Sequence, residues 1–125
     1  MDYTDVWGVR VVNTTLHDIT FRRSGIEDFL QTVPPSGTVI NAVPFTDTIE
    51  VANGVSIVRT KYEGNPDGFK FLKDIPMDSS IIIIGSIIAA LAYPGKVKSL
   101  IAWKGYKQLP PHERVYVYNK FRVFI

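Results

Sequence analysis

Basic and aromatic side chains are the residues of this sequence best suited to binding chemistry. Arginine holds a phosphate through its planar guanidinium, and the face of an aromatic ring can stack on a nucleobase. The arginines lie within predicted strands or at their ends, and the aromatic residues are concentrated in the C-terminal third of the chain. The candidates are Arg22, Arg23, Arg59, Arg122, Trp103, Tyr106, Tyr116 and Tyr118. Together they suit a nucleotide. Taken singly, strand-end arginines are usually solvated and strand tyrosines usually pack against neighbouring strands.

A second candidate lies in the apolar segment IIIIGSIIAALAYPG, residues 81–95. The segment is shorter than the roughly 20 residues that a membrane-spanning helix needs. Its isoleucines predict an internal strand over 80–84, and its alanines predict a short helix from Ser86, with the whole segment buried. Gly85 would permit the turn between them. Ser86 is then either only the N-cap of the helix or part of a phosphate site at the helix start.

Catalytic and metal chemistry have weaker support. The chain has no cysteine and only two histidines, which excludes a cysteine-based or multi-histidine zinc site. Neither Ser36 nor Ser86 lies in a nucleophile elbow, and the glycines form neither a P-loop nor a dinucleotide-binding motif. His17, among Asn, Thr and Asp, is typical of a turn rather than of a general base. We therefore expect a protein that is not an enzyme and needs no cofactor.

Length and charge restrict the class of protein. A chain of 125 residues with 46% hydrophobic residues predicts one globular domain over 1–125. A net charge of only +2 argues against binding to long nucleic acids, so any contact with a nucleotide must be local. The N-terminus is acidic and polar, unlike a signal peptide, which favours the cytoplasm and no membrane partner.

Short alternating segments separated by turn residues predict an α+β fold, a mostly antiparallel β sheet with one short helix after an internal strand. The expected strand pairs are 7–13 with 18–23, 28–33 with 38–43, the runs on either side of Asn53-Gly54, and 114–118 with 121–125. Residues 63–80 are expected to form a turn-rich connector, and one more strand should precede Leu109. The apolar C-terminal hairpin either forms a homo-oligomer interface or closes the monomer's own core.

Five stretches, in order along the chain, resemble a family of small proteins carried by phages and bacteria. They are VVNTTLHDITF, VPPSGTV, NGVSIVRTKY, SSIIIIGSIIAALAYPG and YNKFRVF. The positions that match the family pattern are Asn13, Thr14, His17, Pro34, Pro35, Ser36, Gly37, Arg59, Thr60, Ser86 and Arg122. The chain departs from the pattern at Leu16, where the family has proline before the histidine. Pro34, Pro35 and Gly37 are best explained by turn geometry, which leaves the polar positions as functional candidates.

That family is similar to the phage anti-defence sponges, small oligomeric proteins that bind cyclic nucleotide signals of immune systems such as Thoeris and CBASS without cleaving them. The resemblance implies a homo-oligomer in the host cytoplasm that sequesters cyclic ADP-ribose isomers or cyclic oligonucleotides. It also implies that the arginines hold phosphates, that an aromatic residue stacks on adenine, and that Asn13 and His17 belong to the binding site. The alternative, from another class, is a small β-domain virion or assembly protein that acts through protein contacts.

Overall fold

A computed structural model describes residues 3–23, 29–75, 80–103, 105, 108–110 and 113–125. Its secondary structure is mostly β, with 51% strand and two short helices, so the predicted α+β class is confirmed. The strands are β1 (Thr4–Val6), β2 (Val9–Asn13), β3 (Ile19–Arg23), β4 (Phe29–Val33), β5 (Ala42–Ala52), β6 (Val55–Gly64), β7 (Ile81–Ile84), β8 (Ser99–Ala102) and β9 (Val115–Arg122). The helices are α1 (Pro66–Lys73) and α2 (Ile87–Ala92).

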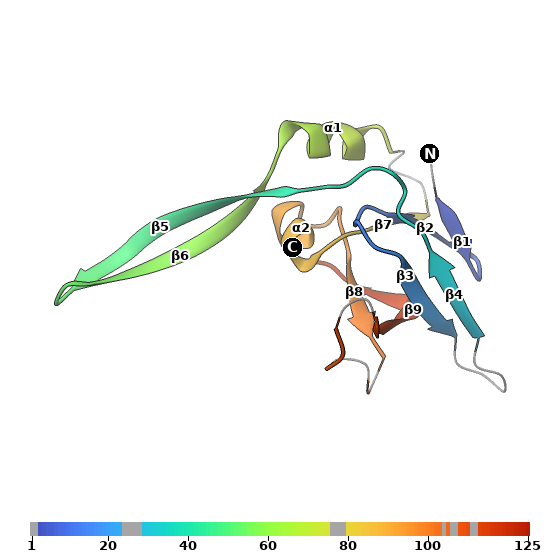
Figure 1. The fold of residues 1–125 in the computed structure, drawn as a ribbon. Helices are drawn as coiled ribbons and strands as arrows, with labels where there is room; N and C mark the ends of the chain where they lie inside the picture. The colour runs from blue at the N-terminus through green and yellow to red at the C-terminus, as the bar shows by residue number, and fades with distance from the viewer. Residues whose placement is uncertain (1–2, 24–28, 76–79, 104, 106–107, 111–112) are drawn as a thin grey trace.

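The strands form three sheets, with the orders β1-β2-β7, β4-β3-β9-β8 and β5-β6 (Figure 1). Most neighbours are antiparallel, as expected from the sequence. Two pairs are parallel: β2 with β7, and β3 with β9. We call the first two sheets with α2 the body, and the hairpin of β5 and β6, residues 42–64, the arm.

The body has a core on both faces of the β1-β2-β7 sheet. On one face Val12 and Ile83 pack against the alanines of α2, Tyr93 and Val97, and all of these residues are buried. On the other face Val11 and Ile84 pack in a second cluster that includes residues of β3 and β4. Because successive side chains of a strand point to opposite faces, a strand covered on both sides is apolar at every position. This explains the run of four isoleucines in β7.

The apolar segment 81–95 forms a strand followed by a helix, as predicted. The Ser86 hydroxyl accepts a hydrogen bond of 3.0 Å from the Ala89 N–H and so caps α2. Two details of the prediction are wrong. The segment is not wholly buried, because α2 exposes one apolar face. In addition, β7 is the last strand of its sheet rather than an internal one, with only an isolated bridge from Ile84 to Lys98 beyond it.

Gly85, at the joint between β7 and α2, does not have a positive φ, so the expected turn is not the reason for glycine. A Cβ atom at this position would lie 2.9 Å from Val97 Cγ1 and 3.2 Å from Thr14 Oγ1. Glycine is needed because the joint packs closely against its neighbours.

Three of the expected strand pairs are absent from the described part of the chain. Strands β2 and β3 lie in different sheets, and the actual N-terminal hairpin is β1–β2, which turns at Trp7-Gly8 with positive φ at both residues. Residues 38–41 are not a strand, so the Pro-Pro-Ser-Gly segment joins β4 to the arm without forming a hairpin. Strand β9 continues through Asn119-Lys120 instead of turning there, because its first part pairs with β3 and both its ends pair with β8, with a register shift in the β8–β9 pairing between them.

Helix α1 lies within residues 63–80, where only a connector was expected. The Asn65 side chain accepts a hydrogen bond of 2.7 Å from the Gly68 N–H, and Pro66 and Asp67 occupy the first turn. Asparagine at the N-cap, proline at the first position and an early acidic residue are ordinary helix-start signals. The expectation of one helix was therefore wrong, although the signal for the second was present.

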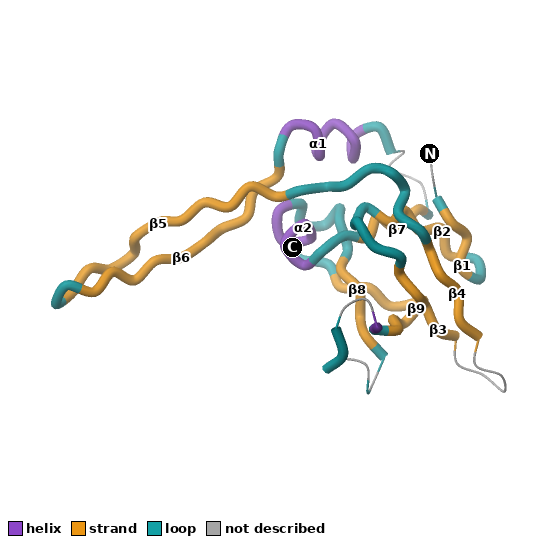
Figure 2. The backbone as a smooth tube through the Cα atoms, in the orientation of Figure 1, coloured by secondary structure: helices purple, strands orange, loops and turns teal. Residues whose placement is uncertain are grey.

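The arm turns at Asn53-Gly54, where both residues have positive φ, and this hairpin is confirmed. Residues from Val43 to Lys61 are all exposed. The arm projects away from the body, as Figures 1 and 2 show. At its base the buried Tyr93 hydroxyl accepts a hydrogen bond of 2.8 Å from the Asn65 N–H and donates one of 3.1 Å to the Asn41 carbonyl. Tyr93 thus fixes both ends of the arm to the body.

Candidate functional site

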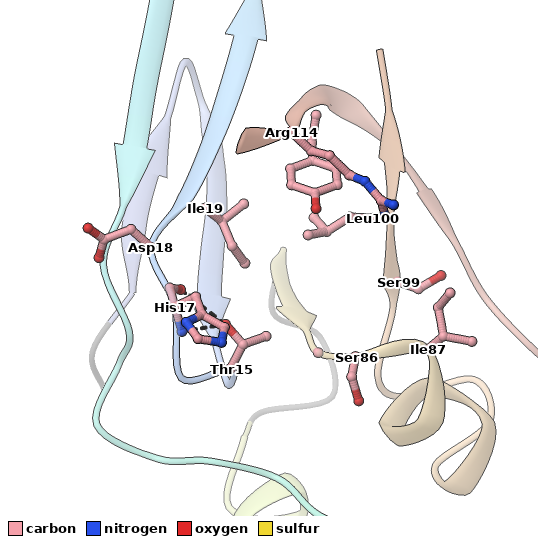
Figure 3. A pocket seen from close by; sticks show the side chains of 11 residues that line it. Thr15, His17, Asp18, Ile19, Ser86, Ile87, Ser99, Leu100 and Arg114 are labelled. Atoms are coloured by element: carbon pink, nitrogen blue, oxygen red, sulfur yellow. Dashed lines mark hydrogen bonds between the residues drawn. The ribbon is translucent and has the colours of Figure 1, made fainter. Parts of the chain in front are cut away.

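A pocket of about 290 Å³ opens where elements of the two larger sheets meet. Its walls come from the loop between β2 and β3, the joint between β7 and α2, strand β8 and the start of β9 (Figure 3). The lining residues are Thr15, His17, Asp18, Ile19, Gly85, Ser86, Ile87, Ser99, Leu100, Arg114 and Tyr116. Three residues predicted from the sequence, His17, Ser86 and Tyr116, are therefore brought together.

The buried Asn13 side chain holds the loop that carries His17. The Asn13 side-chain amide donates to the carbonyls of His17 (2.8 Å) and Val33 (3.2 Å). Its side-chain oxygen accepts from the N–H and hydroxyl of Thr15, at 2.9 and 2.7 Å. Asn13 was predicted to bind the ligand, but these bonds occupy its amide, and it positions the loop instead.

His17 itself is exposed at the pocket wall, and its backbone bonds to Thr15 and Asn13. Its neighbour Asp18 directs its carboxylate away from the pocket (Figure 3). Ser86, on the floor, uses its hydroxyl as the cap of α2. The helix has only six residues, so capping explains Ser86 without an anion.

Arg114 is the cation of the described pocket wall, and the sequence reasoning missed it. Its Nε donates a hydrogen bond of 2.6 Å to the Leu109 carbonyl. This bond holds the guanidinium at the pocket wall, and among the described residues neither terminal nitrogen has a hydrogen bond, so both can meet another acceptor. Its position immediately before the alternating segment VYVY could have indicated Arg114 from the sequence.

Ser99 contributes a buried polar atom. The residue is 1% exposed, and within the described residues its hydroxyl has no hydrogen-bond partner. Buried hydroxyls are nearly always paired, and leaving one unpaired costs about 1 to 3 kcal/mol. Because this oxygen has almost no exposed surface, a ligand atom could reach it only after a shift of the surrounding side chains.

Two other predicted residues, Arg22 and Trp103, form a separate cluster. The Arg22 guanidinium lies 5.1 Å from the centre of the Trp103 ring, and the indole N–H donates a hydrogen bond of 3.2 Å to the Arg22 carbonyl. Ile19 and Phe21 of β3 face the core, so the alternation of the strand places Arg22 on the opposite face from the pocket. The N–H of Trp103 and the ring face next to the guanidinium thus already interact with Arg22.

The remaining predicted residues do not join the pocket within the described chain. Arg23 is exposed at the end of β3, and Arg122 is exposed at the end of β9, opposite Ser99 in the β8–β9 register. Arg59 lies on the arm, where its Nε is 3.6 Å from Asp47 Oδ2. Tyr106 lies outside the described residues. The four arginines therefore do not converge on one site within a single copy of the chain.

The chain matches no protein-family model, no curated protein and no solved structure. The resemblance to the anti-defence sponges therefore stays a prediction. Within the described ranges, no helix is both long and apolar enough to span a bilayer. The same ranges contain no cluster of three or more His, Cys, Asp or Glu side chains that could hold a metal ion.

Proposed function

We propose that the protein binds a small nucleotide signal in the Arg114 pocket and sequesters it without cleaving it, as an anti-defence protein in the cytoplasm of an infected host. The proposal rests on one observation: a guanidinium held by a backbone carbonyl and an aromatic side chain line the same, mostly apolar pocket. Arg114 suits a phosphate, since charge-assisted bonds from guanidinium to phosphate are among the strongest in proteins.

Apolar side chains give the same pocket a surface for a base or a ribose. Ile19, Leu100 and Tyr116 line it beside the polar groups. Mostly apolar walls with a few placed polar groups are typical of small-molecule sites. A volume of about 290 Å³ lies just below the range of about 300 to 1,000 Å³ for such sites. Cyclic ADP-ribose isomers are therefore favoured over the larger cyclic oligonucleotides.

The hydrogen bonds made by the polar groups of the pocket favour binding without cleavage. A nucleophile needs a base within hydrogen-bond reach. The Ser86 hydroxyl is used in capping, and the hydrogen bonds of His17 involve its backbone rather than its ring. In the described part of the pocket, no hydrogen bond joins a histidine ring to a hydroxyl.

Calorimetry on wild type, Arg114→Ala and Arg23→Ala tests the proposal with cyclic ADP-ribose isomers and cyclic oligonucleotides. A charge-assisted bond contributes about 1.5 to 3 kcal/mol, so Arg114→Ala should bind at least about tenfold more weakly. Arg23→Ala, an exposed arginine outside the pocket, is the matched control and should bind like wild type. Mass spectrometry of the released ligand should recover it intact. A wild type that binds none of these ligands overturns the proposal.

The second candidate function is assembly through protein contacts, and the exposed arm favours it. A hairpin of this length with apolar side chains on its surface is typical of proteins that bind other chains. Failure of all nucleotide binding, together with incorporation of the labelled chain into virions, would support this candidate instead.

A further inference from the structure

The loop between β2 and β3 fixes the backbone of His17 but leaves its ring without a bond. The His17 carbonyl accepts a hydrogen bond of 2.8 Å from the Asn13 amide, and the His17 N–H donates one of 3.3 Å to the Thr15 hydroxyl. The residue is exposed at the pocket wall, and its ring has no hydrogen bond within the described chain. A fixed backbone below an unbonded ring is the arrangement expected of a side chain that is preorganised for a ligand.

Most other polar side chains of the pocket are already occupied or turned away. The hydroxyls of Thr15 and Ser86 form hydrogen bonds within the chain, and Tyr116 also interacts within it. Ser99 is buried, and the Asp18 carboxylate is directed away from the pocket (Figure 3). None of these groups is placed to bind an anion.

Two polar groups of the described pocket remain: the terminal nitrogens of Arg114 and the ring nitrogens of His17. They come from different elements, the segment before β9 and the loop between β2 and β3. Figure 3 shows the two side chains on opposite sides of the pocket. A single phosphate at Arg114 would leave the other side of the pocket unused, whereas a ligand with two anionic groups can meet both.

On the basis of the function proposed above, we infer that His17 is a second anion contact and that the pocket selects nucleotides with two phosphate groups. A histidine ring donates from both nitrogens only when it is protonated, and histidine changes charge between about pH 5 and pH 8. The other titratable or charged groups of the described lining are Asp18, Arg114 and Tyr116. Residues of these types ordinarily titrate outside that range.

The sign of the pH dependence follows from this assignment. A bound anion favours the protonated ring, so binding and protonation stabilise each other. The affinity should therefore rise as the pH falls, and the protein should take up protons when it binds near neutral pH. Cyclic ADP-ribose isomers suit the measurement, because each phosphate of their pyrophosphate keeps one negative charge between about pH 5.5 and pH 7.5.

Calorimetry of the full chain with these isomers tests the inference. Wild type should bind about fivefold or more tightly at about pH 5.5 than at about pH 7.5. Binding enthalpies in two buffers of different ionisation enthalpy should show proton uptake. His17→Gln keeps a neutral polar side chain, so it should lose both effects and bind about tenfold more weakly than wild type at the lower pH. Its melting temperature should match wild type, since the ring is exposed and unbonded.

Two further variants locate the effect. Arg114→Ala should bind more weakly at both pH values but keep the pH dependence. His112, the other histidine, lies outside the described residues, and His112→Gln should behave like wild type. Cyclic AMP, which has a single phosphate with one charge, should bind wild type at least about tenfold more weakly than the isomers do at about pH 5.5.

The outcomes separate this inference from the function on which it rests. Wild-type affinity that does not change with pH overturns the inference and leaves the proposed function standing. A pH dependence that persists in His17→Gln, or one that is lost in His112→Gln, does the same. Cyclic AMP that binds as tightly as the isomers overturns the selection for two phosphates. A wild type that binds no isomer at either pH overturns the proposed function itself.

Discussion

The body and the arm use the same β-branched residues in opposite ways. In β2 and β7 these residues are consecutive, and both faces of the strands are covered by other elements. In β5 and β6 they alternate with polar residues, and nearly all of them stay exposed. Strand-forming sequence alone thus does not decide what is core, because burial depends on which elements come to lie over each face.

The largest expected effect separates a buried isoleucine from an exposed one. Ile83 in β7 is 4% exposed, and Ile57 in β6 is 45% exposed. Ile83→Asp places an unpaired charge in the core at a cost of several kcal/mol, which is comparable to the whole stability of a small domain. We expect Ile83→Asp to be unfolded at 25 °C and Ile57→Asp to melt within a few degrees of wild type.

Thermal melting followed by circular dichroism measures this difference. Both variants replace isoleucine by aspartate, so intrinsic strand propensity is nearly matched and burial is the main difference. A cooperative melt of Ile83→Asp near the wild-type temperature would contradict the two-sided core described for β7.

The parts of the fold that could be predicted from the sequence are those fixed by neighbouring residues. Asn53-Gly54 determines a hairpin by its backbone preferences, and Gly85-Ser86 separates a strand composition from a helix composition. The parallel pair β2–β7 joins Val12 to Ile83. These residues are far apart in the sequence, so no local pattern predicts that they pair. The predicted C-terminal hairpin failed for the same reason, since the partners of β9 are distant strands and not its own second half.

The candidate site shows the same limit. His17, Ser86 and Tyr116 were selected by residue type and do line the pocket. Ser99 was not, because a serine at the start of a strand has no unusual sequence context, and its burial results from tertiary packing. Arg22 lies away from the pocket because side chains alternate between the two faces of β3. The sequence shows this alternation, but only the structure, in which Ile19 is buried, shows on which face Arg22 lies.

An intermediate effect is expected where the arm joins the body. Tyr93→Phe removes only the hydroxyl, which bonds the Asn65 N–H and the Asn41 carbonyl, and keeps the packing of the ring. Losing bonds to partly buried groups should lower the free energy of unfolding by about 1 to 2 kcal/mol. Urea denaturation measures the loss, and hydrogen exchange should show faster opening at Asn65 than at Val12. Unchanged exchange at Asn65 would show that the hydroxyl does not hold the arm.

The smallest effect is expected within the arm, at the ion pair between Asp47 and Arg59. Their Oδ2 and Nε atoms are 3.6 Å apart, and both side chains are more than half exposed. Water and salt screen such a pair, so it should contribute less than about 1 kcal/mol. A double-mutant cycle of Asp47→Asn and Arg59→Gln, from urea denaturation at low and high salt, measures the coupling free energy. It should be small at low salt and vanish at high salt, because the arm is open to solvent on this face. A coupling above 1 kcal/mol that persists in high salt would mean that this charged face of the arm is covered in solution.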